Sequence, residues 1–218
     1  MLFLVAFVAL SAFFGFRSVP AERIAERIVA LVPHVLLFVL VCLAALLATV
    51  PSQVKAAWQV SIKVGAAQAA AVGVVSGLTL AFVYLTELSP LLVAAQRTFG
   101  DFVPPGDVIS TLSGSRSVFF LANVVLAPFV EETLYRGVAL PVLTSKLGTR
   151  RALAISCGCF GLLHWAGGLW YMLLTGVVAG GLFAGLYLWR KGIVAPFCAH
   201  LALNLAEFLF AWRTTSNA

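Results

Sequence analysis

The sequence is poor in charge, and in acidic residues above all. Only 10% of its 218 residues are charged, with 8 Asp and Glu against 14 Lys and Arg, whereas about a quarter of the residues in a soluble globular protein are charged. Hydrophobic residues make up 62% of the chain, and its mean hydropathy is strongly positive. These proportions exclude an ordinary soluble domain and indicate an all-α polytopic membrane protein.

Several other signals are missing. The net charge of +6 is spread along the chain without a basic stripe, which argues against nucleic-acid binding. The four cysteines lie in apolar runs, so they indicate neither a disulfide framework nor a zinc knuckle. The chain has no internal repeat, and its length leaves no room for a separate soluble domain. We therefore expect one integral-membrane domain over residues 1–218.

Long apolar runs set the expected number of helices, because a membrane-spanning helix needs about 20 apolar residues. We expect about seven spans, within a range of six to eight, over residues 1–16, 28–50, 64–85, 117–143, 152–166, 169–189 and 193–212. The first run is short, but it lacks a basic leader and a clear cleavage site, which favours a helix over a signal peptide. Residues 53–63 are expected to form a loop or an interfacial turn. Residues 91–102 are expected to form an amphipathic helix in the membrane interface.

Two further patterns concern packing and orientation. Glycine pairs at small-xxx-small spacing allow close helix approach, and they occur at Gly73/Gly77, Gly176/Gly180 and Gly181/Gly185. The loops 144–151 and 190–192 are basic and are expected to lie on one membrane face. The distribution of basic residues favours a cytoplasmic N-terminus.

The run over residues 117–143 contains two adjacent glutamates and an arginine. Charges at such depth in a membrane are costly, so they indicate a functional site. Glu132 and Arg136 are four residues apart with the acid first, which is the favourable order for an intrahelical ion pair. Glu131 points about 100° away on the helix and has no local partner.

Polar groups on two other predicted helices reach a similar depth. Glu131 and His164 lie about 22 and 20 Å from the basic loop that borders their helices. His200 and Asn204 lie about 14 and 20 Å from the loop 190–192, and as residues i and i+4 they share a helix face. A carboxylate, two imidazoles and an amide are therefore expected at one depth.

Such a set has three chemical uses. A buried glutamate beside imidazoles can hold a water molecule and act as a general base. Two histidines and a carboxylate can bind zinc and leave one position open for water. A histidine and an amide can donate to a developing oxyanion. All three uses indicate hydrolysis inside the membrane.

The polar residues also form three ordered motifs, each on an apolar run. The motifs are Glu131-Glu132-x-x-x-Arg136, Phe160-x-x-x-His164 and His200-x-x-x-Asn204. Together they resemble the motifs of the CPBP family of intramembrane proteases, which comprises CAAX prenyl proteases and bacteriocin-processing proteins. The resemblance covers about residues 115–212, which form the motif-bearing core.

The resemblance implies a membrane peptidase with seven or eight helices. Its substrate would be membrane-embedded or lipidated, and the cleaved bond would lie near the C-terminus or the membrane-proximal part of that substrate. By position, Glu131 and His164 would activate water, whereas His200 and Asn204 would stabilise the oxyanion. A prenylated C-terminal tail, a bacteriocin-like leader and a C-terminal sorting signal are the substrate classes that stay open. The expected location is a bacterial or archaeal cell membrane.

The chemistry of the site leaves a metal as an alternative. Glu131, His164 and His200 are of the kinds that zinc takes as ligands. Histidines that bind zinc usually donate to a carboxylate behind them, and we expect no carboxylate to be free for this because Arg136 would occupy Glu132. We therefore favour a glutamate-type hydrolase that requires no cofactor, with zinc as the alternative.

Simpler roles are also open for single residues. Phe160 is expected to pack rather than react, Asn204 can link two helices, and Glu207 can form a pocket wall or an interfacial charge. Two other functions compete with the protease. One is a non-catalytic relative of the bacteriocin self-immunity type, and the other is a proton- or metal-coupled transporter, for which inverted repeats would be expected.

Overall fold

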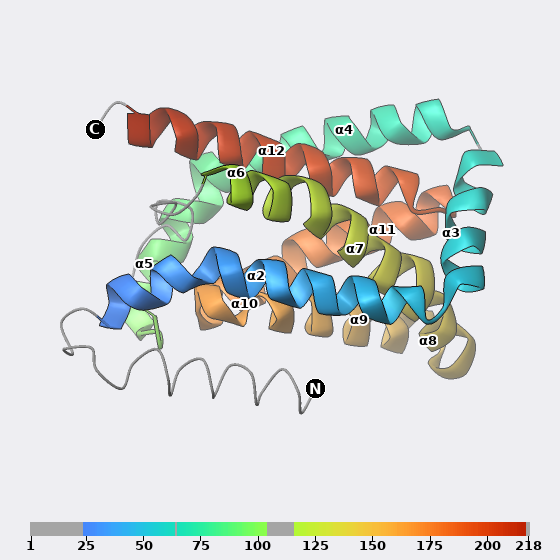
Figure 1. The fold of residues 1–218 in the computed structure, drawn as a ribbon, viewed down its shortest axis with the longest axis horizontal. Helices are drawn as coiled ribbons and strands as arrows, with labels where there is room; N and C mark the ends of the chain where they lie inside the picture. The colour runs from blue at the N-terminus through green and yellow to red at the C-terminus, as the bar shows by residue number, and fades with distance from the viewer. Residues whose placement is uncertain (1–23, 64, 104–115, 217–218) are drawn as a thin grey trace.

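The computed structural model describes residues 24–63, 65–103 and 116–216, and the elements in these ranges are helices joined by short connections (Figure 1). No strand occurs among the described residues, and the all-α prediction is confirmed. The helix expected over residues 1–16 lies outside the described part of the chain.

Five elements lie in the described part of the N-terminal half. They are α2 (Ile24–Ala48), α3 (Pro51–Lys63), α4 (Ala66–Val83), the π-helical turn η2 (Tyr84–Leu88) and α5 (Ser89–Phe99). The C-terminal half contains α6 (Arg116–Phe119), η3 (Phe120–Leu126), α7 (Ala127–Glu132), η4 (Thr133–Ala139), α8 (Leu140–Leu147), α9 (Thr149–Leu163), η5 (Trp165–Gly167), α10 (Leu169–Leu174), η6 (Thr175–Ala179), α11 (Gly180–Arg190) and α12 (Val194–Ser216). The turns η2, η3, η4 and η6 are π-helical and join consecutive α-helices, a feature that often marks functional sites.

Three helical stretches of the described chain are long and apolar enough to cross a membrane. They are Ala66–Phe99, Leu169–Arg190 and Val194–Arg213, which correspond to the spans expected over residues 64–85, 169–189 and 193–212. The pair Leu36–Ala48 and Pro51–Gln59 passes the same test together, although it is bent by 93°. The spans expected over residues 117–143 and 152–166 are helical as well.

Residues 53–63 do not form the loop or turn expected from their polarity. They belong to α3, whose first residue is Pro51, a position where the missing N–H of proline costs nothing. Trp58 fixes α3 to the bundle, because its ring stacks on Phe129 at 5.5 Å and its indole N–H donates to Thr133 Oγ1 at 3.2 Å. α3 thus closes one end of the molecule (Figure 1).

The segment after residue 85 is also more regular than expected. α4 continues through η2 into α5, so that one helix runs from Ala66 to Phe99. Pro90 is the second residue of α5 and directly follows the π-helical turn η2. Gly100, with a φ of 78°, ends the helix. The separate interfacial helix expected over residues 91–102 is therefore the end of a membrane-length helix.

Gly73 and Gly77 bring α4 against α12. A Cβ atom on either glycine would overlap a backbone carbonyl oxygen of α12, that of Ala195 or that of Ala199. The two backbones thus touch where the side chains are missing, which confirms the close approach expected from the glycine spacing. Since His200 follows Ala199, this contact fixes the height and rotation of the helix that carries the third motif.

A second close approach joins α9 to the helix α10–η6–α11. A Cβ on Gly176 would meet the carbonyl oxygen of Cys157 at 2.9 Å, and one on Gly180 would meet the Phe160 ring at 3.3 Å. The packing role expected for this pair is confirmed. The same role was wrong for Gly181 and Gly185, because no atom of the described ranges lies within 4 Å of a Cβ built on either residue.

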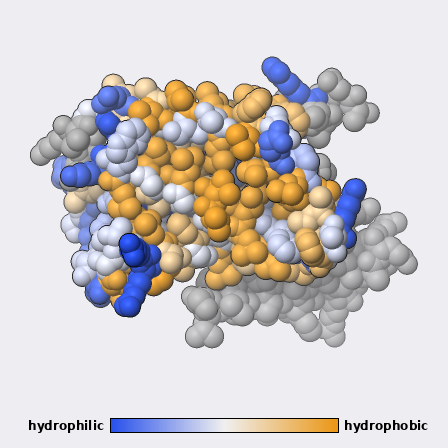
Figure 2. Space-filling view, turned by 180° about the vertical axis from the view of Figure 1, so that it is seen from behind, coloured by the Kyte–Doolittle hydropathy of each residue, from blue (hydrophilic) through white to orange (hydrophobic). Residues whose placement is uncertain are grey.

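The exterior of the described part is apolar, whereas ionisable groups lie inside. Large side chains such as Phe82 and Val177 are 68% and 73% exposed. Figure 2 shows hydrophobic residues across the middle of one face and hydrophilic residues near its ends. The charged residues of the first motif are buried. This distribution is typical of a protein surrounded by hydrocarbon.

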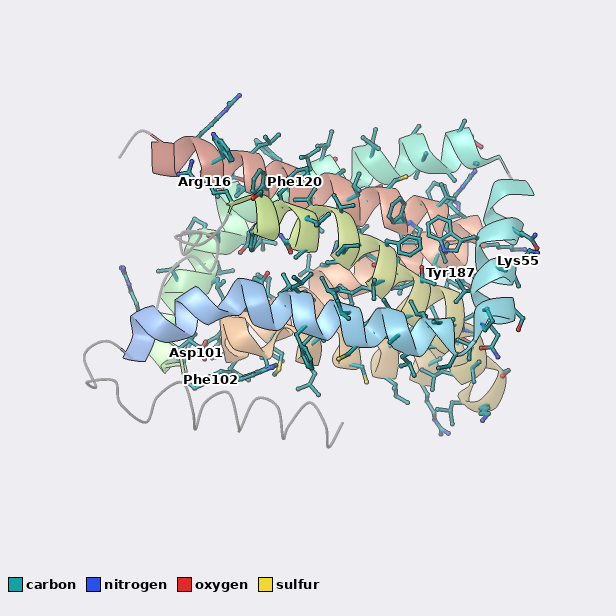
Figure 3. The ribbon with its side chains drawn as sticks, viewed as in Figure 1. Lys55, Asp101, Phe102, Arg116, Phe120 and Tyr187 are labelled. Carbon is teal, nitrogen blue, oxygen red and sulfur yellow. The ribbon has the colours of Figure 1, made fainter. Side chains whose placement is uncertain are left out.

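Three segments that carry basic residues lie at one end of the molecule. α3, the α8–α9 turn and the α11–α12 connection lie together there (Figure 1). Lys55 on α3 lies at this end, and Asp101 lies at the opposite end (Figure 3). The expectation that loops 144–151 and 190–192 share a face is confirmed. The cytoplasmic placement of the N-terminus stays a prediction.

Candidate active site

The first motif lies on α7 and η4 in the centre of the bundle. Glu132 and Arg136 are 0% exposed and Glu131 is 2% exposed. Ionised groups at such depth are retained only when partners compensate their lost hydration. The contacts of these three residues therefore show how the site is built.

Arg136 is held by three kinds of contact. Its Nη1 donates to Glu132 Oε1 at 3.0 Å, which confirms the predicted intrahelical ion pair. Its Nη2 donates to the carbonyl oxygen of Gly180 at 2.9 Å, so the guanidinium also ties α7 to α11. Its Cζ lies 4.4 Å from the centre of the Phe160 ring, close enough for a cation–π contact.

Glu132 has a second partner that the sequence did not predict. His200 Nδ1 lies 3.0 Å from the same Oε1 atom that accepts from Arg136. The expectation that Arg136 would leave no carboxylate free to orient an imidazole was therefore wrong for His200. One carboxylate oxygen accepts from both the arginine and the histidine, because α12 packs on α7. The His200 ring also stacks on Phe183, with centres 4.7 Å apart.

His164 ends α9 and has a defined tautomer. Its Nδ1 lies 2.8 Å from the carbonyl oxygen of Phe160. A carbonyl oxygen only accepts hydrogen bonds, so Nδ1 must carry the proton and Nε2 holds the lone pair when the ring is neutral. The second motif thus has a structural logic, because the backbone of its phenylalanine orients its histidine.

The Phe160 ring lies at the centre of the motif residues. It contacts His164 and His200 with ring-centre distances of 4.9 and 5.8 Å, and its other neighbours are Arg136 and Phe183. The packing role expected for Phe160 is confirmed. The ring separates the ion pair from the space beside the two histidines.

Asn204 connects two helices and still faces the site. Its Nδ2 donates to the backbone carbonyl of Asn123 at 2.7 Å, linking α12 to η3. The linking role weighed for this amide is confirmed. Its side-chain oxygen and its second N–H remain for other partners.

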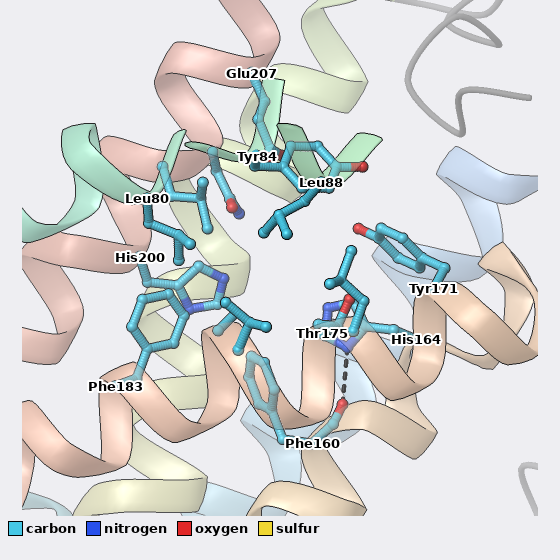
Figure 4. Close-up of a pocket in the computed structure, with 15 residues that line it drawn as sticks. Leu80, Tyr84, Leu88, Phe160, His164, Tyr171, Thr175, Phe183, His200 and Glu207 are labelled. Atoms are coloured by element: carbon cyan, nitrogen blue, oxygen red, sulfur yellow. Dashed lines mark hydrogen bonds between the residues drawn. The ribbon is translucent and has the colours of Figure 1, made fainter. Parts of the chain in front are cut away.

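His164, His200 and Asn204 meet at a small cavity of about 50 Å³ (Figure 4). A space of this size holds at least one water molecule, which requires about 10–15 Å³ by the same measure. Apolar side chains from α4, η2, α10, η6, α11 and α12 form much of the remaining wall. Glu207 also lines the cavity, so its expected role as a pocket wall is confirmed.

Glu131 does not line this cavity. It is buried on α7, and its Oε2 atom has no hydrogen-bond partner among the residues that the structure describes. The structure therefore brings together three of the four predicted catalytic residues, His164, His200 and Asn204, and leaves the fourth beside them in the core. A buried carboxylate oxygen without a partner carries a desolvation cost, which is typical of functional rather than purely structural groups.

The predicted zinc ligands do not form a ligand set. Among the described residues, no three His, Cys, Asp or Glu side chains are placed to hold a metal ion. His164 and His200 each have Nδ1 engaged, and their Nε2 atoms are of the type that zinc takes. Glu131 is not gathered with them, so the donors present do not fit a three-ligand zinc site.

Among the wall residues that escaped prediction are Tyr171 and Thr175. They lie on α10 and η6, in a helix that contributes no motif residue. The available signal was their spacing, because hydroxyl-bearing residues at i and i+4 share one face of an otherwise apolar helix.

Asp101 was also missed, and it holds the start of that helix. Its carboxylate accepts from the backbone N–H groups of Leu169 at 2.8 Å and Trp170 at 3.4 Å. Partial burial favours the neutral acid, but hydrogen bonds from Leu169, Phe102, Gln96 and Trp170 outweigh it and hold the pKa of Asp101 below its usual value. A residue 68 positions away thus caps the helix, a contact that no local pattern predicts.

These features define a class of protein. It is an all-α polytopic membrane protein in which two histidines and an asparagine line a small cavity among apolar helices, and a buried glutamate–arginine pair lies behind one of the histidines. Residues 113–206 match the family described as type II CAAX prenyl endopeptidase Rce1-like. The predicted resemblance is confirmed, and the matched segment carries all three motifs. No curated protein and no solved structure matches the chain.

Proposed function

We propose that the protein is an intramembrane endopeptidase that hydrolyses a peptide bond near the C-terminus or the membrane-proximal part of a membrane-associated substrate. The observation that carries the proposal is the cavity where His164, His200 and Asn204 meet, with Glu132 bonded to the outer side of the His200 ring. The family supports a CAAX-type protease in general, and the roles of the single residues are part of the proposal.

Water activation is assigned to His164 and Glu131. His164 presents Nε2 as an acceptor, because the Phe160 carbonyl holds the proton on Nδ1. Glu131 is the only carboxylate of the first motif that no arginine or histidine engages, since Arg136 and His200 both bind Glu132. A base needs an uncommitted carboxylate, so Glu131 suits this role and Glu132 does not. The role requires the Glu131 carboxylate to turn toward the cavity.

Oxyanion stabilisation is assigned to His200 and Asn204. His200 donates Nδ1–H to Glu132, so it donates from Nε2 as well only when the ring is protonated. Asn204 has one N–H left after its bond to Asn123. In a site without bulk water, each such donor lowers the free energy of a transition state that carries an oxyanion by about 3 kcal/mol.

The reaction then follows from these positions. A water molecule loses a proton to the base and its oxygen attacks the peptide carbonyl carbon, which gives a tetrahedral oxyanion. The C–N bond breaks as the oxyanion reforms the carbonyl, and the proton passes from the base to the leaving nitrogen. The products are a new carboxylate and a new amine.

The proposal is tested by mass spectrometry of candidate peptides before and after incubation with the purified protein in detergent. Three peptides are compared, a prenylated C-terminal tail, a bacteriocin-like leader and a C-terminal sorting signal. We expect one class to yield two fragments whose summed mass exceeds that of the peptide by one water. If all three remain intact under conditions where the protein is folded, the protein is not an endopeptidase for these classes and the non-catalytic alternative is favoured.

A further inference from the structure

The helix formed by α10, η6 and α11 supplies a wall of the cavity although it carries none of the three motifs. Tyr171 and Thr175 line the cavity together with His164 and His200. Figure 4 shows both side chains on the His164 side of the cavity, with Thr175 next to the imidazole. Because they are four residues apart on one helix, the two hydroxyls follow each other along the same face.

The Tyr171 ring is held in place from two sides. Its edge packs against the His164 ring with centres 6.1 Å apart. On the other side lies Gly167, where a Cβ atom would overlap the Tyr171 ring. The ring thus occupies a space that exists only because residue 167 has no side chain, and Asp101 caps the helix one turn earlier.

Thr175 differs from Thr79, Thr86 and Thr133, although it shares the lack of a hydroxyl partner among the described residues with Thr144 on α8, which lies away from the cavity. Thr79, Thr86 and Thr133 each donate to the carbonyl oxygen four residues earlier, which satisfies a hydroxyl within its own helix. Thr175, the first residue of the π-helical turn η6, makes no hydrogen bond through its hydroxyl to the described part of the protein. Its hydroxyl is directed to the cavity and is half-buried there.

We propose that Tyr171 and Thr175 bind the peptide group of the substrate next to the bond that is cleaved, a role that rests on the proposed endopeptidase function. A peptide group presents one N–H donor and one C=O acceptor, and a hydroxyl can both donate and accept. Neutral hydroxyls match an uncharged peptide group without burying another charge in a cavity that already borders an ion pair. They also place the peptide beside His164 Nε2, where the activated water is bound.

The experiment uses whichever peptide the wild-type protein cleaves in the mass-spectrometric assay. Thr175→Val removes the hydroxyl at nearly constant shape, Thr175→Ser retains a hydroxyl, and Tyr171→Phe removes the phenol oxygen alone. Thr144→Val and Tyr187→Phe are the matched controls. They remove the same hydroxyl groups from residues that do not line the cavity.

We expect Thr175→Val and Tyr171→Phe each to raise KM about three- to tenfold with kcat within a factor of two, since each loses a neutral hydrogen bond made in both the ground state and the transition state. Thr175→Ser and both controls should stay within twofold of wild type in KM. If the two hydroxyls only stabilised the fold, their removal would lower the fraction of active protein. The apparent kcat would then fall, and KM would stay unchanged.

The outcomes separate the two proposals. If Thr175→Val and Tyr171→Phe match the controls while Glu131→Gln is inactive, the binding role is refuted and the endopeptidase stands. The binding role is also refuted if Thr175→Ser is as impaired as Thr175→Val, because the hydroxyl is then not what matters. If the wild type cleaves none of the three peptide classes, the endopeptidase proposal fails first and the binding role fails with it.

Discussion

At the scale of single residues, the main finding is that Glu132 accepts hydrogen bonds from two side chains, those of Arg136 and His200. The spacing of four residues predicted its pair with Arg136, and the structure contains that pair. The same spacing could not reveal His200, which lies 68 residues away and reaches Glu132 only through packing of α12 on α7. Local periodicity therefore predicted half of this network, and the tertiary half required the fold.

Replacing Glu132 should damage both folding and activity. In Glu132→Gln, Arg136 keeps its charge in a buried setting without a carboxylate, which costs about 3–5 kcal/mol, and His200 loses the acceptor that orients its ring. We expect a lower thermal midpoint in detergent and a loss of peptide cleavage. Glu87→Gln, an identical change at an exposed position, should leave both unchanged. A Glu132→Gln protein with wild-type melting and turnover would show that the network has no structural role.

At the scale of helices, the sequence predicted contacts without predicting partners. The spacing of Gly73 and Gly77 indicated a close approach, but only the structure shows that α12 is the helix approached. Polarity alone misassigned residues 53–63 and 91–102, because a short polar helix and a turn share the same composition. Helix α3 and the continuation of α4 into α5 depend on neighbours such as Phe129, which lie far away in sequence.

A methyl group at the contact between α4 and α12 should be costly. In Gly77→Ala the new Cβ would overlap the carbonyl oxygen of Ala199, and forcing the helices apart costs about 1–3 kcal/mol. We expect a lower thermal midpoint, together with weaker cleavage because His200 moves with α12. Gly181→Ala is the control, since it adds the same atom into open space. Equal melting of the two variants would contradict the close contact.

The cap on α10 makes stability depend on pH. The pKa of Asp101 is lowered in the folded protein, so its contribution is fully present above the unfolded pKa of about 3.9 and is lost as the pH falls through the lower folded value. Asp101→Ala should cost about 1 kcal/mol near neutral pH, as loss of a cap does. The difference in thermal midpoint between wild type and Asp101→Ala should shrink below about pH 4. A difference that is the same at pH 3 and pH 7 would argue against the ionised cap.

At the scale of the whole molecule, composition predicted the class and three ordered motifs predicted the family. Both predictions used information that the sequence alone contains, namely the apolar content and the order of a few polar residues. The placement of Glu131 away from the cavity wall could not be predicted in this way. Depth along a helix was estimated well enough to group the residues, but rotation about the helix axis decides which of them share a cavity.

The dependence of the protein on zinc is tested by measuring the zinc content and the cleavage activity of the full-length purified protein. Among the described residues, Glu131, His164 and His200 are not placed to hold one metal ion together. We therefore expect less than about 0.1 zinc per chain, because a catalytic zinc site needs three protein ligands. Cleavage should persist after exhaustive treatment with a membrane-permeant chelator. Near-stoichiometric zinc in active protein, with activity lost on chelation and restored by zinc, would instead establish the metal-dependent alternative.

The most direct test of the endopeptidase is the mass of a cleaved peptide after incubation with wild-type protein, Glu131→Gln or Glu87→Gln. The wild type and Glu87→Gln should release the same two fragments at similar rates, because Glu87 is exposed and lies outside the cavity wall. Glu131→Gln should keep its thermal midpoint within a few degrees and release no detectable fragment, since the amide cannot accept the proton of the water. Undiminished cleavage by folded Glu131→Gln would contradict the central claim that this glutamate activates the water.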